Sequence, residues 1–62
     1  MNNPIMKYFK YDHLPPHLQM VSKPFGDLAA EMDMKLPQCA ETSAGLRKLL
    51  EAKECLVRAA LT

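Results

Sequence analysis

Hydrophobic residues in the middle of the chain recur at alternating steps of three and four, which is the spacing of one face of an α-helix. This first apolar stripe consists of Leu18, Val21, Phe25, Leu28, Met32 and Leu36. The pattern predicts a helical segment over residues 16–35 that stops before Pro37, because the residue preceding a proline is driven out of the helical conformation.

A second apolar stripe occupies the C-terminal third and predicts a helix over residues 42–61, with Thr42 or Ser43 as its N-cap. Its members are Leu46, Leu49, Leu50, Leu56, Val57 and Ala60. Two amphipathic helices joined by a short connection pack antiparallel. The predicted fold class is therefore all-α, a helical hairpin preceded by an N-terminal arm over residues 1–13.

Pro24 interrupts the first stripe, so the helix is expected to be either kinked there or begun anew. A restart is favoured, because Ser22 is a suitable N-cap that places Pro24 in the first turn. On the second helix, charged pairs four residues apart are expected to support the exposed side. They are Arg47 with Glu51 and Glu54 with Arg58.

With 62 residues the chain forms one domain, and a chain of about this size buries only about 60% of the surface that it exposes when unfolded. Two amphipathic helices also leave one side of each stripe uncovered. Copies of the hairpin would cover those sides, so a homo-oligomer is predicted.

Charge and composition exclude several kinds of partner. A formal net charge of +1 gives no general reason to bind duplex nucleic acid, whose affinity depends on neutralising many phosphates. No apolar run approaches a membrane span, and the N-terminus lacks the order of a signal peptide. We expect neither a membrane nor duplex nucleic acid as partner, and a cytoplasmic protein.

Chemistry-bearing residues are sparse. Cys39 and Cys55 have neither disulfide-framework nor metal-ligand spacing and are interpreted as free thiols. His13 and His17 are four residues apart, but two intervening prolines argue against a shared helical face for a metal. No nucleophile stands near a positioned base, and no glycine-rich phosphate loop occurs. The chain is predicted to be a binding module and not an enzyme, without metal or cofactor.

The arm carries the one cluster with a recognisable binding chemistry. Tyr8, Phe9 and Tyr11 stand together with Lys7 and Lys10 in five consecutive residues. Aromatic faces stack on bases and lysines meet phosphates, so such a cluster can hold a small nucleotide. The alternative is that Phe9 and one tyrosine simply pack the arm onto the hairpin.

Two further lysines have both a functional and a structural interpretation. Lys23 follows Ser22 at the expected start of a helix, where free N–H groups favour an anion, or it is simply exposed. Lys53 lies between Leu49 and Val57 on the second stripe and either snorkels to water or joins a ring of cations in an oligomer.

Several stretches resemble the small phage anti-CBASS sponge proteins, which share a hairpin domain with the anti-Thoeris sponges. They are Tyr8-Phe9-Lys10-Tyr11-Asp12-His13-Leu14-Pro15-Pro16-His17-Leu18-Gln19, Val21-Ser22-Lys23-Pro24-Phe25, Leu46-Arg47-Lys48-Leu49-Leu50-Glu51-Ala52-Lys53 and Val57-Arg58-Ala59-Ala60. The resemblance covers about residues 8–61. It implies a homohexamer in the cytoplasm of the infected host, which binds cyclic oligonucleotide immune messengers without cleaving them and so blocks activation of the CBASS effector.

The resemblance also implies site residues. In a pocket between paired protomers for cyclic dinucleotides such as cyclic GMP-AMP, Tyr8 or Tyr11 would stack on a base and Lys23 would meet a phosphate. Phe9 and His13, from the same stretch, are further candidates for this pocket.

A second pocket for cyclic trinucleotides such as cyclic tri-adenylate would use Arg58 or Arg47 with the hydroxyl of Ser22. The residues after Lys23 read Pro-Phe-Gly without a threonine, which departs from the family at this second pocket.

A function of another class is a protein–protein adaptor, in which methionines of the first helix grip a helix of a host protein. The methionines concerned are Met20, Met32 and Met34.

Overall fold

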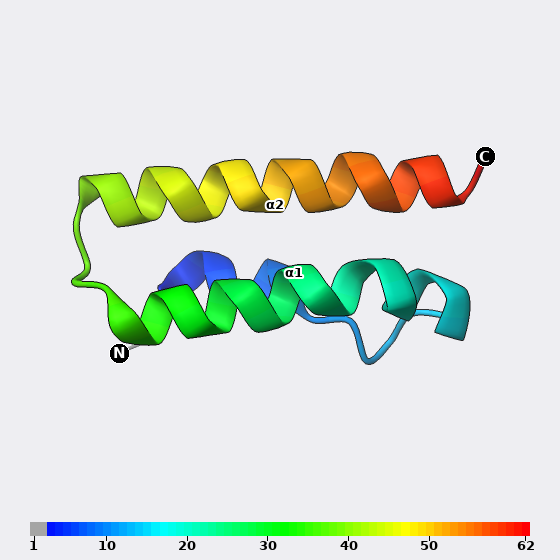
Figure 1. Ribbon diagram of the computed structural model, residues 1–62, viewed down its shortest axis with the longest axis horizontal. Coiled ribbons are helices and arrows are strands. Elements are labelled where there is room, and N and C mark those ends of the chain that lie inside the picture. The colour runs from blue at the N-terminus through cyan, green and yellow to red at the C-terminus, as the bar shows by residue number, and fades with distance from the viewer. Residues whose placement is uncertain (1–2) are drawn as a thin grey trace.

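The computed structural model describes residues 3–62 and shows a 3₁₀ helix followed by two long antiparallel α-helices (Figure 1). The 3₁₀ helix η1 spans Pro4–Phe9, α1 spans Pro16–Lys35 and α2 spans Ala40–Ala60. Residues 3–62 contain no strand. An all-helical hairpin with an N-terminal arm is thus confirmed, while Met1 and Asn2 of the expected arm lie outside the described residues.

Prolines and chain geometry determine both ends of α1. Pro15 is extended (φ −58°, ψ 153°) and Pro16 occupies the first turn, where the missing N–H of proline costs nothing. At the other end Leu36 is extended before Pro37 (φ −112°, ψ 150°), and its N–H still bonds the carbonyl of Met32. The helix therefore begins and ends where the prolines predict.

Pro24 lies inside α1, which continues through it as one helix. The preferred restart at Ser22 is therefore wrong. Proline removes the hydrogen bond to the carbonyl four residues earlier, and here that carbonyl belongs to Met20, whose side chain is 78% exposed. Pro24 is exposed as well. On this outer face water can solvate the orphaned carbonyl, so the helix tolerates the proline.

The second helix begins at Ala40, two residues before the expected N-cap Thr42. Cys39 is the N-cap residue, and its side chain makes no capping hydrogen bond. The hydroxyl of Thr42 instead donates to the carbonyl of Pro37 at 2.7 Å. The Thr42 hydroxyl thus closes the hairpin loop and does not cap α2. Threonine is a common N-cap residue, and this preference led to a predicted helix start two residues too late.

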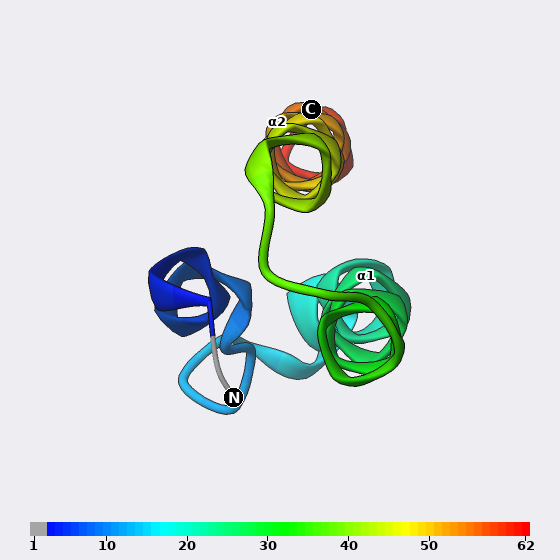
Figure 2. The ribbon, with the colours of Figure 1, turned by 90° about the vertical axis from the view of Figure 1, so that its left-hand side faces the viewer.

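The arm covers one side of the hairpin and completes the core. Figure 2 shows η1 beside the pair of long helices, on the side that faces away from the viewer in Figure 1. Phe9 of the arm is 3% exposed and packs with Ala29 of α1 and with Leu46 and Leu50 of α2. Part of the cover expected from other copies of the hairpin therefore comes from the chain's own arm.

The face of α1 that the arm covers is built from small and polar residues. Its buried members include Ser22, Gly26, Ala29 and Asp33. A Cβ on Gly26 would lie 2.9 Å from the carbonyl oxygen of Phe9 and 3.3 Å from the ring of Tyr11. The arm backbone can approach α1 this closely only because Gly26 has no side chain.

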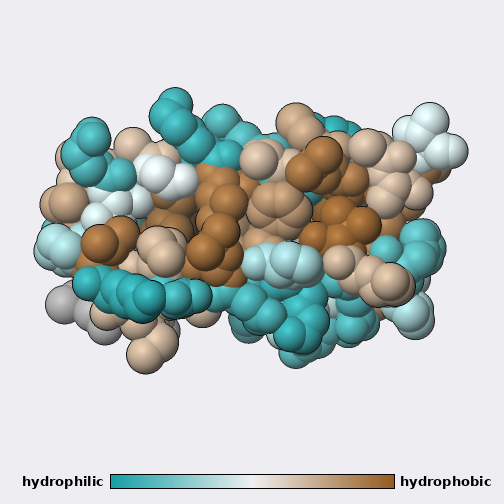
Figure 3. Space-filling model, viewed as in Figure 1, coloured by the Kyte–Doolittle hydropathy of each residue, from teal (hydrophilic) through white to brown (hydrophobic). Residues whose placement is uncertain are grey.

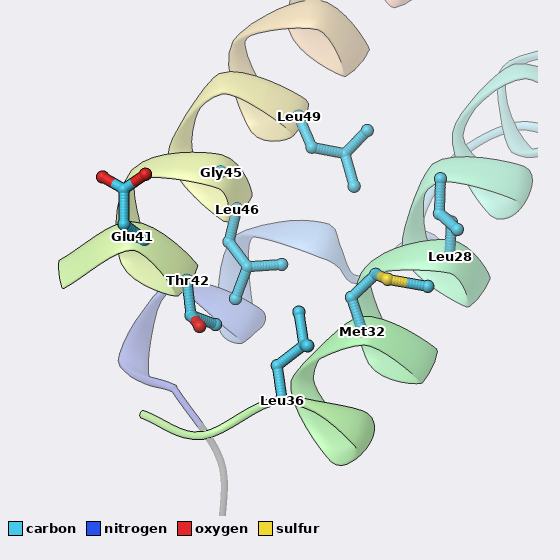
Figure 4. Close-up of a pocket in the computed structure, with 8 residues that line it drawn as sticks. All are labelled: Leu28, Met32, Leu36, Glu41, Thr42, Gly45, Leu46 and Leu49. Carbon is cyan, nitrogen blue, oxygen red and sulfur yellow. The ribbon is translucent and has the colours of Figure 1, made fainter. Parts of the chain in front are cut away.

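The opposite side of the hairpin remains open and apolar. Figure 3 shows a band of hydrophobic side chains along the groove between α1 and α2. A hollow of about 320 Å³ lies in this groove and is shown in Figure 4. The lining residues are Leu28, Met32, Leu36, Glu41, Thr42, Gly45, Leu46 and Leu49. This surface is called the open groove below.

The two ion pairs within residues 3–62 both lie on α1, between Lys23 and Asp27 and between Glu31 and Lys35. The pairs expected on α2 are not formed, and Arg58 instead donates to the sulfur of Cys55 at 3.4 Å. None of the helices in the described part is long and apolar enough to cross a bilayer.

Candidate functional site

Tyr11 and Lys23 are neighbours in the folded chain. The ammonium of Lys23 is 5.8 Å from the centroid of the Tyr11 ring, within the range of a cation–π contact. The same ammonium donates to Asp27 at 2.7 Å, and both charged side chains are more than half exposed. The hydrogen bond that Lys23 donates to Asp27, and then the negative charge of Asp27, raise the pKa of Lys23.

A shallow hollow of about 350 Å³ opens between the arm and α1 next to this contact. Tyr11 forms part of its wall, together with Gly26 and Asp27 of α1 and Lys10 and Asp12 of the arm. The hollow therefore has an aromatic side and charged groups of both signs.

Tyr8 lies in a different environment, between two lysines. Its side chain is among the exposed large apolar groups, with the residue 55% exposed. The ammonium of Lys7 is 5.2 Å from the centroid of the Tyr8 ring, and the ammonium of Lys53 donates to the Tyr8 carbonyl at 3.0 Å. Neither lysine forms an ion pair among residues 3–62, so this end of η1 carries net positive charge beside an accessible ring.

Phe9 and His13, the other two arm candidates, differ in exposure. Phe9 is a core residue with only 3% of its surface exposed. In this chain neither face of the Phe9 ring is open to a base. Phe9 instead packs the arm onto the hairpin. His13 is exposed in the turn between the arm and α1.

A partly buried polar cluster anchors the start of the arm to the end of the hairpin. The backbone N–H of Asn3 donates to both carboxylate oxygens of Asp33, at 3.2 and 3.4 Å. The Asn3 side-chain amide donates to Gln38 and to Ser43, and Gln38 donates to Asp33 at 2.9 Å. This group of Asn3, Asp33, Gln38 and Ser43 is called the clasp below.

Sequence reasoning missed the clasp. Acidic side chains usually lie at the surface of a protein, whereas Asp33 is 4% exposed. The only available signal was its position, because Asp33 lies four residues after Ala29 and seven after Gly26, on one helical face with both.

The three residues suggested for a second pocket are not brought together in one chain. Arg47 and Arg58 are exposed on α2, three helical turns apart and thus about 16 Å along the axis. Ser22 is fully buried in α1, and its hydroxyl has no hydrogen-bond partner in the described structure. A ligand could reach that hydroxyl only after the packing around Ser22 changed.

The structure assembles no evident catalytic or metal centre from residues 3–62. No group of three His, Cys, Asp or Glu side chains within that range is placed to hold a metal ion. Cys39 and Cys55 are exposed free thiols. A hydrogen bond with the Thr42 side chain, followed by one from the Thr42 backbone N–H, lowers the pKa of Cys39.

Comparisons with protein-family models, with curated proteins and with solved structures find no match for this chain.

Proposed function

We propose that the protein is a phage anti-defence sponge that binds cyclic dinucleotide immune messengers and holds them intact, in a pocket formed between paired copies of the chain. The proposal rests on the resemblance of residues 8–61 to the anti-CBASS sponges. The structural observation that supports it best is the pairing of arm tyrosines with lysines: Tyr8 is 55% exposed with Lys7 over its ring, and Lys23 lies against Tyr11.

Of the two tyrosines, Tyr8 has the ring that a base can reach. Stacking requires an open aromatic face, and the Tyr11 ring is already placed against α1 at Gly26 and Lys23. The Tyr8 ring has only the ammonium of Lys7 over it. We therefore assign base stacking to Tyr8 and a supporting contact with Lys23 to Tyr11.

Lys23 is available to a phosphate at little cost. Its bond to Asp27 is an exposed pair within one helix, and such pairs contribute little to stability because water screens the two charges. A phosphate group can replace the carboxylate with a charge-assisted hydrogen bond of similar or greater strength. The negative charge of the nearby Asp27 opposes the binding of an anion. A doubly charged messenger is therefore bound more strongly by two Lys23 side chains than by one.

Pairing of chains explains how Tyr8 and Lys23 can share one ligand. Within one chain, Lys23 contacts Tyr11 and Asp27, whereas Tyr8 contacts Lys7 and Lys53. A cyclic dinucleotide has two bases and two phosphates, so a pocket with one Tyr8 and one Lys23 from each copy matches its symmetry. A hexamer would hold three such pockets.

Hydrolysis is not part of the proposed function. A sponge acts by stoichiometry, so it needs affinity above that of the host receptor and several pockets per assembly. Binding energy alone suffices, and no general base or metal is required.

Isothermal titration with cyclic GMP-AMP tests the proposal. The wild-type protein is expected to bind with a submicromolar Kd, and Lys23→Ala and Tyr8→Ala are each expected to weaken binding more than tenfold. Lys35→Ala is the matched control, because Lys35 also forms an exposed pair four residues apart on α1. Absence of binding by the wild type, or equal losses in Lys23→Ala and Lys35→Ala, would contradict the proposal.

A second pocket for cyclic tri-adenylate remains a proposal that rests on the resemblance alone. It would use exposed Arg58 or Arg47, with the hydroxyl of buried Ser22 exposed by repacking. Titration with cyclic tri-adenylate is expected to show binding that Arg58→Ala or Arg47→Ala weakens. Equal affinity in wild type and both variants would remove this pocket from the proposal.

The open groove also favours the alternative of an adaptor that holds a host helix, because apolar grooves of this kind accept amphipathic helices. Met32 lines the groove, whereas Met20 and Met34 are 78% and 83% exposed on other parts of α1. The adaptor is favoured if Met32→Ala abolishes anti-defence activity while alanine at Tyr8 and Lys23 has no effect.

A further inference from the structure

Two attachments hold η1, one at each end. At its start, the clasp binds the backbone and side chain of Asn3, whose side-chain oxygen also caps η1 through the N–H of Ile5. At its end, the ammonium of Lys53 donates to the Tyr8 carbonyl at 3.0 Å. The exposed Tyr8 ring is therefore carried by a backbone segment that α2 holds directly.

Lys53 is suited to this role by its surroundings. It is half-buried on α2 between Leu49 and Val57, which are half-buried as well. The apolar stem of a lysine in such a stripe can lie along its apolar neighbours, and the Lys53 ammonium reaches the Tyr8 carbonyl of the arm. A bond from a charged donor to a carbonyl is stronger than one between neutral groups, and within residues 3–62 no carboxylate forms an ion pair with Lys53 that would compete.

We propose that Lys53 is a positioning residue for ligand binding: its bond to the Tyr8 carbonyl fixes the end of η1 and so sets the orientation of the Tyr8 ring toward a base. Lys53 acts through the arm and not through contact with a phosphate. The binding part of this inference rests on the proposed function, whereas the attachment of the arm can be tested without a ligand.

The first test measures amide hydrogen exchange of η1 in ligand-free protein. Lys53→Met keeps the length and apolar stem but removes the donor, and Lys53→Arg keeps a donor. Lys48→Met is the matched control, because Lys48 is an exposed lysine of α2 with no described bond to the arm. We expect exchange of the η1 amides to become about fivefold faster in Lys53→Met, as loss of one such bond implies, and to remain near wild type in the other two.

The second test measures affinity for cyclic GMP-AMP at two salt concentrations. Lys53→Met is expected to bind about fivefold more weakly than Lys48→Met at both concentrations. If Lys53 acts by positioning the arm, the salt dependence of the affinity stays unchanged in Lys53→Met, because no phosphate contact is lost.

Three results would overturn the inference. They are unchanged arm exchange in Lys53→Met, unchanged affinity, or an affinity loss that disappears at high salt, which would indicate a direct phosphate contact. If the wild type fails to bind cyclic GMP-AMP, the proposed function fails while the exchange result still decides whether Lys53 holds the arm.

Discussion

Asp33 is the residue on which the anchoring of the arm depends most. Its buried carboxylate accepts hydrogen bonds from the Asn3 backbone and from the Gln38 side chain. A buried charge is tolerated only when such donors surround it. The clasp thus uses one acidic side chain to tie the arm to the end of α1 and to the loop that follows.

Asp33→Ala is expected to lower the free energy of unfolding by about 2 kcal/mol, because it leaves the buried N–H of Asn3 and the partly buried amide of Gln38 without this acceptor. Urea unfolding at one fixed protein concentration measures the change. Glu31→Ala, which breaks only the exposed pair with Lys35, is the control and is expected to cost less than about 1 kcal/mol. Equal losses in the two variants would show that the clasp contributes nothing specific.

Residue type alone predicts the wrong environment for two polar residues of α1. Serine favours helix starts, which led to Ser22 as an N-cap, whereas Ser22 is fully buried in the middle of α1. Its position requires a small side chain where the arm lies close, and this requirement comes from tertiary packing. Asp33 is buried through the same kind of tertiary packing, although its residue type favours the surface. A helix sequence does not reveal which face an irregular arm will cover.

At the scale of elements, the helices were predictable and the arm was not. Apolar periodicity and the prolines Pro16 and Pro37 indicate two helices and the bounds of α1. The arm has no period, so its 3₁₀ helix could not be derived, whereas its packing through Phe9 was one of the two interpretations of the aromatic cluster and is confirmed. The close approach of arm and α1 at Gly26 is the contact on which that packing depends.

Gly26 and Gly45 form a matched pair for testing this contact, since both lie within α-helices. Alanine at a glycine in a helix interior ordinarily stabilises by about 0.5–1 kcal/mol. Gly45→Ala meets nothing within 4 Å and should show this gain, whereas Gly26→Ala places a Cβ 2.9 Å from the Phe9 carbonyl oxygen. We expect Gly26→Ala to lower the Tm and to speed amide exchange in η1.

A Tm that rises in both variants would mean that the arm does not lie against α1 as described. A Tm that falls for Gly45→Ala would mean that a second chain in the open groove, which Gly45 lines, packs too closely against Gly45 to leave room for a Cβ.

At the scale of the whole molecule, the open groove is what the single chain leaves unfinished. The arm covers one side of the hairpin, and the band of apolar side chains on the other side stays exposed (Figure 3). Leu28 and Leu36 in this groove are 43% and 45% exposed. Self-association would remove this surface from water, which is favourable by about 25 cal/mol for each Å² buried.

Leu28→Lys tests whether the groove is the surface that joins copies. The substitution should change the fold of one chain little, because the lysine stem can lie in the groove with its ammonium in water. Sedimentation velocity is expected to show smaller species for Leu28→Lys and unchanged species for Met34→Lys. Met34 is the control because it is 83% exposed on the same helix and does not line the groove. Unchanged assembly in both variants would place the interface elsewhere.

The candidate site was predicted only in its components. The composition of the arm indicates aromatic and cationic groups, and the resemblance adds their roles. The structure separates them into one set around Tyr11 and Lys23 and another around Tyr8 and Lys53. Which groups share a ligand depends on how copies pair, and neither periodicity nor local propensity contains that information.

Native mass spectrometry of the protein with cyclic GMP-AMP tests whether paired chains hold an intact messenger, because one spectrum counts chains and ligands and gives the mass of the released ligand. We predict assemblies with an even number of chains, one ligand for every two chains, and a released ligand of unchanged mass. Ligand bound to single chains, a hydrolysed ligand, or assemblies that take up none would contradict this prediction.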